Sequence, residues 1–406
     1  MKAVLIFALA AVSAAHAGTT AVDPPAAEVI APEPKPVWLT PTLDARLRYE
    51  FADIAGFDPS HALTLRVRPG LRTGVWHGFS AFVEGEFTGV GIDDYHGGAA
   101  GVDPFDPNNS TIADPGTAEL NQAYLQYTGF DTTVKLGRQR IIYDNAALIG
   151  NVGWRQNEQT YDAISLVHKF AHGLTLNYAW INQVNRIYGS SAEGAAKDSG
   201  TKIHLLNAAF TGIDRVKLGG YIYLMNFDAP ALRGWDNDTF GVSAETKVGD
   251  IAVHAELAFQ QEAGPANDSE AFYLHLTASR TFGSQVVLAG VEHLDAGFQT
   301  PLATLHAMNG FADATDLLRA LGTHGGLTDS YLSHTFPLGW GVNWTNVAHL
   351  FGDNELGTSI GIGFDSVLAK KFTDQLSAIA KLGYFDAEDA RYRDTTRASI
   401  ELDFTF

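Results

Sequence analysis

The carboxyl-terminal stretch of the sequence reads Arg397-Ala-Ser-Ile-Glu-Leu-Asp-Phe-Thr-Phe406. Apolar residues occupy every second position from Ala398 to Phe406, and polar residues fill the positions between them. Because successive side chains of a strand point to opposite faces, this pattern predicts a β-strand with one apolar and one polar face. An alternating strand that ends on an aromatic residue is typical of the last strand of an outer-membrane barrel, in which lipid contacts the apolar face and water the other. A soluble β-sandwich is the alternative that this segment alone leaves open.

The amino-terminal end predicts export. Residues 1–17 combine Lys2, an apolar stretch from Ala3 to Val12 and the small-x-small sequence Ala15-His16-Ala17, which is the pattern of a signal peptide. The apolar stretch is shorter than the about 20 residues of a membrane-spanning helix, so we expect cleavage rather than an amino-terminal anchor. Residues 18–37 are rich in Pro and Ala and predict a periplasmic linker. Residues 38–406 then form the predicted barrel.

Segments of alternating hydrophobicity recur through this predicted barrel. We count about eighteen of them, an even number that suits a single-chain transmembrane antiparallel β-barrel. The predicted strands are residues 43–51, 63–74, 79–90, 119–127, 132–140, 159–169, 174–182, 201–210, 215–225, 238–247, 251–261, 269–281, 284–292, 325–335, 342–351, 355–368, 374–385 and 395–406.

The predicted connectors alternate between two kinds. One set is tight and carries Gly or Asp, as at residues 248–250 and 282–283, whereas the interleaved set is mostly longer and more polar, as at 91–118, 141–158 and 293–325. Short periplasmic turns and long external loops predict this alternation, and a soluble β-protein has no reason to maintain it. A barrel of this size leaves room for water inside, so one chain can form a pore.

Composition excludes some classes of partner and site. The chain contains no Cys, which excludes disulfides, lipoprotein anchoring and thiolate metal sites. Its formal net charge of −19 argues against nucleic acid as a partner. Many acids fall in predicted loops, where we expect solvated surface, with cation bridging to lipopolysaccharide as the alternative; these are Asp93, Asp94, Asp103, Asp106, Asp114, Asp386, Glu388, Asp389 and Asp394.

Charged side chains concentrate on the polar face of the first two predicted strands. Alternation places five arginines toward the lumen, together with Asp44 and Glu50, and these arginines are Arg46, Arg48, Arg66, Arg68 and Arg72. Glu84 and Glu86 face the lumen from the third strand, and Glu401 and Asp403 from the last. Two interpretations stay open: a self-neutralising network that stiffens the wall, or a basic track that guides an anionic solute through two-point guanidinium contacts.

The segment from Leu136 to Asp162 contains a Gly-Arg-Gln strand end, then Trp154-Arg155-Gln156 and the aromatic-Asp pair Tyr161-Asp162. It resembles the alginate-export family of outer-membrane barrels. Residues 309–313, 326–331, 46–50 and 119–124 fit the same family. This resemblance implies an eighteen-stranded barrel with a basic lumen, and it places Arg138, Arg155 and Asp162 near the constriction.

Two features qualify what the resemblance implies. Simple alternation from Leu136 points Arg138 outward, so either Gly137 marks a bulge that resets the register or Arg138 sits above the lipid band. The family's well-studied exporter is gated by a long periplasmic turn before its last strands, whereas residues 369–373 make a short turn here. That difference favours a simpler channel over a dedicated exporter.

A long connector often folds inward in pores of this size. Residues 293–325, which include a plausible short helix at 313–321, and residues 91–118 are the two candidates for the constriction loop. An external cap is the alternative.

Chemistry of other kinds has little support in the sequence. His293 with Asp295 invites a catalytic triad, yet no nucleophile motif accompanies them and none of the 14 His shows a metal-ligand spacing. We expect no enzyme, no metal site and no cofactor.

The sequence instead predicts a porin-like outer-membrane channel that passes small hydrophilic solutes, anionic or sugar-type, by diffusion. Export of an alginate-like acidic polysaccharide and a plugged structural or receptor barrel are the alternatives. Expected partners are outer-membrane lipid, lipopolysaccharide, the solute or polysaccharide, and the barrel-assembly machinery, since the terminal Phe406 resembles the signal that this machinery reads.

Overall fold

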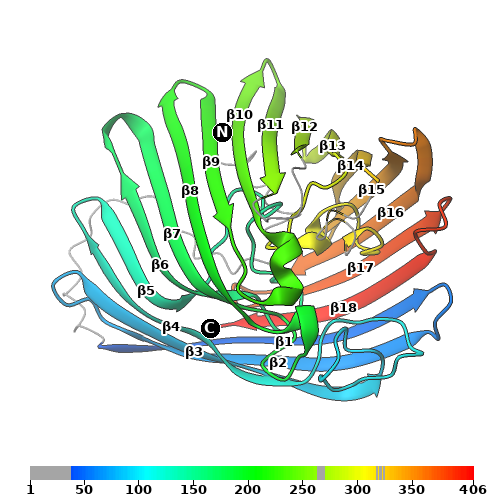
Figure 1. Ribbon diagram of the computed structural model, residues 1–406, viewed down its shortest axis with the longest axis horizontal. Helices are drawn as coiled ribbons and strands as arrows, with labels where there is room; N and C mark the ends of the chain where they lie inside the picture. The colour runs from blue at the N-terminus through cyan, green and yellow to red at the C-terminus, as the bar shows by residue number, and fades with distance from the viewer. Residues whose placement is uncertain (1–37, 263–269, 317–318, 320–321, 323–324) are drawn as a thin grey trace.

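The computed structural model describes residues 38–262, 270–316, 319, 322 and 325–406. The predicted signal peptide (1–17) and linker (18–37) lie outside these residues and stay predictions. In the described chain, eighteen antiparallel strands each pair with their neighbours in sequence. Strand β1 (Leu39–Ile54) also pairs with β18 (Thr395–Thr405), so the sheet closes into a barrel (Figure 1). The predicted eighteen-stranded antiparallel barrel is confirmed.

Several strands extend beyond the alternating segments that predicted them, whereas four are each one residue shorter than predicted. The first half of the barrel contains β2 (Ser60–Thr73), β3 (Phe79–Asp94), β4 (Thr117–Gly129), β5 (Thr132–Gln139), β6 (Thr160–Lys169), β7 (Leu174–Asn185), β8 (Ser199–Ile213) and β9 (Val216–Met225). The second half contains β10 (Asn237–Val248), β11 (Ile251–Glu262), β12 (Glu270–Phe282), β13 (Gln285–Leu294), β14 (Leu327–Gly339), β15 (Val342–Asp353), β16 (Thr358–Lys371) and β17 (Leu376–Ala387). Strands β1 and β3 are among those that extend beyond the prediction, and β5, β6, β9 and β18 are the four shorter ones.

Helical structure is confined to the connectors. The described residues contain four short 3₁₀ segments: η1 (Ala171–Gly173), η2 (Gly194–Ala196), η3 (Pro230–Trp235) and η4 (Leu305–Ala307). In the part of the chain that the structure describes, no helix has the length and hydrophobicity to cross a membrane. Much of the short helix predicted at 313–321 lies outside the described residues.

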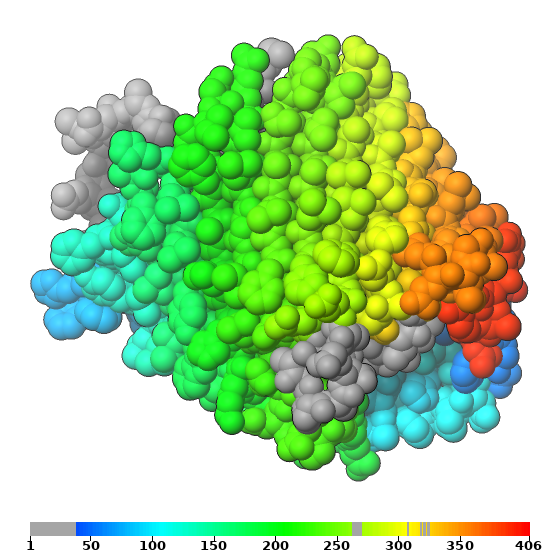
Figure 2. Space-filling view, turned by 45° about the horizontal axis from the view of Figure 1, so that its top comes forward, coloured from blue at the N-terminus to red at the C-terminus, as the bar shows by residue number. Residues whose placement is uncertain are grey.

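The two faces of the sheet differ as the alternation predicts. On β11 and β12 the side chains of Leu257 and Phe272 are 55% and 57% exposed on the outer wall, whereas Glu256 and Tyr273 are 4% and 0% exposed on the inner face. The outer wall forms an unbroken surface across the middle strands in Figure 2. An apolar outer face and a polar interior are what lipid outside and water inside require, so the barrel is of the outer-membrane type.

Aromatic side chains gather at the short-turn end of the barrel. They lie in or beside the tight turns and are strongly exposed: Trp76, Phe79, Phe130, Phe170, Phe282, Trp340 and Phe372. Amphipathic or aromatic rings at this level form the girdle that marks the membrane–water interface in such barrels. The turn between β16 and β17 is short, as predicted, and spans residues 372–375.

Candidate pore constriction

Three long connectors on the opposite end of the barrel fold into its interior. These are the β3–β4 and β5–β6 loops, residues 95–116 and 140–159, and the described part of the β13–β14 loop, residues 295–316, 319, 322, 325 and 326. They bond to one another: the Gly150 N–H donates to the Leu302 carbonyl at 2.8 Å, and the Gln156 N–H donates to Asp114 Oδ1 at 2.7 Å. In Figure 1 the yellow β13–β14 loop lies within the ring of strands. Both loops predicted as rivals therefore enter the lumen, and a third joins them.

Arg46 and Arg48 of β1 tie the barrel seam to the β5–β6 loop. Arg46 Nε donates to Asp403 of β18 at 2.7 Å, and its Nη1 donates to the Trp154 carbonyl at 2.9 Å. Arg48 is fully buried and pairs with Glu401 of β18 at 2.9 Å. Its guanidinium also lies 3.6 Å from the centroid of the Trp154 ring. The two arginines thus hold a loop and close the ring of strands at once.

The next pair of arginines, on β2, is also buried and paired. Arg68 forms an ion pair with Glu86 of β3, and Arg66 forms one with Asp44 of β1. Arg66 lies directly opposite Arg46 in the strand register, so two like charges face each other. Within the described chain, Nε and Nη1 of Arg66 have no hydrogen-bond partner. Arg66 is therefore the least neutralised guanidinium of the group.

A bulge between β3 and β4 positions the partners of Glu84. The register shifts at Glu84/Gly85, which leaves Asn121 and Gln122 both buried on the lumen face. Each donates an amide hydrogen to Glu84 Oε1 at 2.8 Å. Arg140, at the start of the β5–β6 loop, pairs with the same carboxylate at 3.0 Å.

Arg155, in the β5–β6 loop, lies at the centre of the interlocked loops. It pairs with Glu50 of β1 at 3.3 Å and with Asp313 of the β13–β14 loop at 2.7 Å. Arg397 of β18 reaches the same two carboxylates, at 3.3 Å and 3.6 Å. One cluster therefore joins two loops to the seam strands.

Three of the predicted site residues lie elsewhere. Arg72 keeps the face of Arg66 and Arg68 but is exposed near the periplasmic end, where its guanidinium lies 4.8 Å from the Phe82 ring centroid. Arg138 and Asp162 pair across β5 and β6 at 2.7 Å. The charged residues of the barrel wall and the inward loops that do contact one another are called the constriction network below.

Of the two alternatives for Arg138, the bulge at Gly137 is wrong, and the structure agrees with a place beyond the lipid band. Pairing of β5 with both neighbours continues through Gly137 without a shift. Arg138 therefore lies on the same outward face of β5 as Leu136, at the long-loop end of the strand. The glycine serves another purpose. Its φ is +124°, and a Cβ there would lie 2.2 Å from the Ala123 carbonyl oxygen, so the two strands can approach only without a side chain.

Sequence reasoning missed several members of the constriction network. Asp114 was expected on solvated loop surface, but it is 0% exposed and pairs with Arg48 at 3.1 Å; Asp93, Asp94, Asp103 and Asp106 are exposed as expected. Glu158 is buried beside Arg140, and Lys381 of β17 has its Nζ 3.7 Å from the Trp154 ring centroid. Nothing local in the sequence marks these residues, because their partners lie on distant strands.

The network is nearly balanced in charge. Its basic members are Arg46, Arg48, Arg66, Arg68, Arg140, Arg155, Lys381 and Arg397, and its acidic members are Asp44, Glu50, Glu84, Glu86, Asp114, Glu158, Asp313, Glu401 and Asp403. Of the two interpretations of the arginines, the structure favours the self-neutralising network.

A small cavity opens between the loops and the wall, lined by Glu50, Trp154, His306, Phe311, Lys381 and Arg397. The His306 ring stacks on Trp154 with centroids 4.4 Å apart, and its Nδ1 lies 2.6 Å from Asp313. Burial lowers the pKa of His306 to about 3, so the imidazole is neutral at physiological pH and adds no charge to the constriction.

A model of the alginate-export family matches residues 38–186, which span β1 to β7 and two of the three inward loops. The predicted family resemblance is confirmed. The similar motifs at 309–313 and 326–331 lie beyond the matched segment.

Solved structures share the whole fold. OccAB4 of Acinetobacter baumannii superposes with a TM-score of 0.70 at 11% identity, covering 92% of this chain and 99% of that one. The outer membrane protein OpdK of Pseudomonas aeruginosa gives a TM-score of 0.68 at 13% identity, covering 90% and 99%. OccAB2 of Acinetobacter baumannii gives 0.68 at 14% identity, covering 91% and 98%. No curated protein matches the sequence.

Proposed function

We propose that this protein is an outer-membrane channel for the diffusion of small hydrophilic solutes, anionic or sugar-type. The observation that carries the proposal is the constriction itself. Three loops are fixed inside a wide barrel by charged contacts to its wall, which narrows a polar passage. An eighteen-stranded barrel is wide enough to hold water, and fixed loops set a size limit for what passes.

The proposed solute class follows from the charges. The balanced network gives no strong field of either sign, so uncharged sugars are accepted. Arg66 is the least neutralised of the arginines, because its Nε and Nη1 have no hydrogen-bond partner in the described chain and its Nη2 pairs with Asp44. We therefore expect a weak rather than strict preference for anions.

Export of an acidic polysaccharide is the second candidate, and the family match supports it. A polymer of uronates needs a continuous set of unpaired basic groups, whereas the described arginines of the constriction are mostly paired. The short β16–β17 turn also supplies no periplasmic gate.

Conductance in planar bilayers tests the proposal. Refolded protein should form ion-conducting pores with a reversal potential shifted slightly toward anions in a salt gradient. Replacing Arg66 and Arg68 together by Glu should shift that potential toward cations, most strongly at low ionic strength, where screening is weakest.

Each alternative gives a different result. Protein that inserts but conducts no ions would support a plugged barrel. Strong block of the current by alginate oligomers, without block by monosaccharide acids, would support export. The reversal potential would stay unchanged at low salt if the two arginines lay off the ion pathway.

A further inference from the structure

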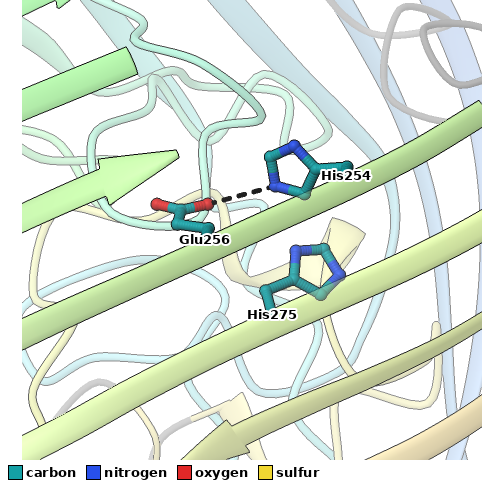
Figure 3. A group of neighbouring side chains, drawn as sticks. All are labelled: His254, Glu256 and His275. Carbon is teal, nitrogen blue, oxygen red and sulfur yellow. Dashed lines mark ion pairs between the residues drawn. The ribbon is translucent and has the colours of Figure 1, made fainter. Parts of the chain in front are cut away.

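A second cluster of polar side chains lies on the lumen wall away from the constriction network. His254 and Glu256 are two residues apart on β11, so they share its inner face, and His275 of β12 lies directly opposite Glu256 in the register. One ligand atom from each of the three lies within 4.8 Å of the others (Figure 3). The cluster sits nearer the tight turn at which β11 begins, on the periplasmic side of the loops.

Two imidazole nitrogen atoms of this cluster form no hydrogen bond in the described chain. These atoms are His254 Nε2 and His275 Nδ1, and both are buried. The whole His275 residue is 9% exposed. His254 Nε2 faces Glu256 Oε2 at 3.5 Å. A buried imidazole nitrogen without a hydrogen bond is costly, so the arrangement indicates a group that bridges these atoms.

The remaining polar atoms of the cluster are held in place. Tyr221 donates its hydroxyl hydrogen to Glu256 Oε1 at 2.7 Å, and His275 Nε2 lies 2.8 Å from the Tyr331 hydroxyl. Contacts of this kind fix the orientation of metal-binding carboxylates and imidazoles in known metal sites. Neither contact uses Glu256 Oε2 or His275 Nδ1, so these two atoms stay available to a shared ligand.

We propose that His254, Glu256 and His275 bind a divalent transition-metal ion of the Zn²⁺ class on the lumen wall. Two imidazoles and one carboxylate are a recurrent three-residue ligand set for Zn²⁺, which keeps a fourth position for water or solute. Ligand atoms around tetrahedral zinc lie about 3.4 Å apart, so small side-chain rotations complete the site. His254 remains partly exposed, which leaves the fourth position open to the lumen.

The chemistry of the ligands determines which ions are bound. Mg²⁺ and Ca²⁺ prefer oxygen ligands in larger numbers, whereas imidazole nitrogen suits Zn²⁺ and its neighbours. The sequence did not reveal the site, because His254-x-Glu256 is a spacing that any strand can contain. The third ligand comes from the neighbouring strand through the register.

Calorimetric titration of folded protein without a polyhistidine tag tests the proposal. Zn²⁺ should bind with one equivalent per chain, and Mg²⁺ should give no binding heat. His254→Ala combined with His275→Ala should abolish that equivalent. Tyr331→Phe should weaken it by about tenfold, as expected for loss of a supporting contact.

Two controls keep the result interpretable. His334→Ala, on β14 and bonded to Gln285, should leave Zn²⁺ binding unchanged. Glu256→Gln retains an acceptor for Tyr221 but loses the anionic ligand, so it should weaken binding in a barrel that keeps its heat-modifiable migration on gels. Wild-type protein that binds no Zn²⁺, or a double variant that binds it as tightly as wild type, would overturn the proposal.

Discussion

Arg68 and Glu86 are a buried pair in which each residue needs the other. The Arg68 side chain is 4% exposed and that of Glu86 is 1% exposed. Arg68→Met therefore leaves an anion buried beside a guanidinium-shaped gap, and breaking such a pair costs about 3–5 kcal/mol. We expect the midpoint of urea unfolding in detergent to fall markedly.

A second substitution separates charge from packing. Glu86→Gln in the Arg68→Met background should restore most of the lost stability, because the amide still accepts the Glu158 N–H that now bonds Glu86 Oε1. Lys217→Met, which removes an exposed pair with Glu245, should cost less than about 1 kcal/mol. Equal losses for Arg68→Met and Lys217→Met would contradict the burial argument.

Trp154 anchors the β5–β6 loop, because Arg48, Lys381 and His306 all contact its ring. Each cation–π contact contributes about 0.5–2 kcal/mol. Trp154→Ala should loosen the loop and give larger, noisier single-channel currents. Trp180→Ala, on the outer wall, should leave the current unchanged. A quiet current of wild-type size from Trp154→Ala would show that the loop is held by its other contacts.

Residue facing was predictable wherever a strand alternates strictly. Arg46, Arg48, Arg66 and Arg68 point inward as the alternation predicts, and Arg138 points outward for the same reason. What alternation cannot supply is the partner across the lumen. Arg48 and Asp114 are 66 positions apart in the sequence, and no local sequence pattern reports a contact over that separation.

At the scale of elements, the three inward loops form a fixed part of the barrel. Ile149 and Leu302 are bridge partners on two of these loops and are both 0% exposed. Because the chain has no native Cys, Ile149→Cys with Leu302→Cys should form one disulfide on oxidation. Oxidised and reduced protein should conduct alike, because passage does not require these loops to separate.

Each single-cysteine variant is the control for an effect of the reducing agent itself. The current through these variants should not change when the agent is added. A current that falls on oxidation and recovers on reduction would mean that the loops must part for passage.

The positions of turns and loops were predictable from length and polarity, but the direction in which a long loop folds was not. A polar loop satisfies its backbone equally well in external water or against a polar lumen wall. The inward position of the loop is fixed by charged contacts, such as those of Asp313 with Arg155 of a neighbouring loop and with Arg397 of the wall. The composition of residues 95–116 is that of an exposed loop, and part of it is buried.

At the scale of the whole molecule, the seam between β1 and β18 decides whether the barrel exists. Phe406 exchanges two backbone hydrogen bonds with Leu43 at 2.8 Å and 3.0 Å, and its ring is 65% exposed at the outer rim. Deleting Phe406 should lower the amount of heat-modifiable barrel in the outer membrane while leaving export across the inner membrane intact. Immunoblots of fractionated cells measure both quantities.

Trp340→Ala is the matched control, since Trp340 is another exposed aromatic residue in a periplasmic turn. It should assemble normally. Normal barrel levels after Phe406 deletion would contradict a special role for this residue.

The buried ion pairs at this seam also determine the order in which contacts form during folding. Arg46 reaches Asp403 and Arg48 reaches Glu401 across 357 and 353 positions of the chain. Contacts between such distant residues form late, because the intervening chain must first be gathered. No partly delivered polypeptide can contain them, so every earlier intermediate is an open sheet with two unpaired edges. Such edges recruit other strands, so we expect the chain to need protection by a partner protein until its last strand has been delivered.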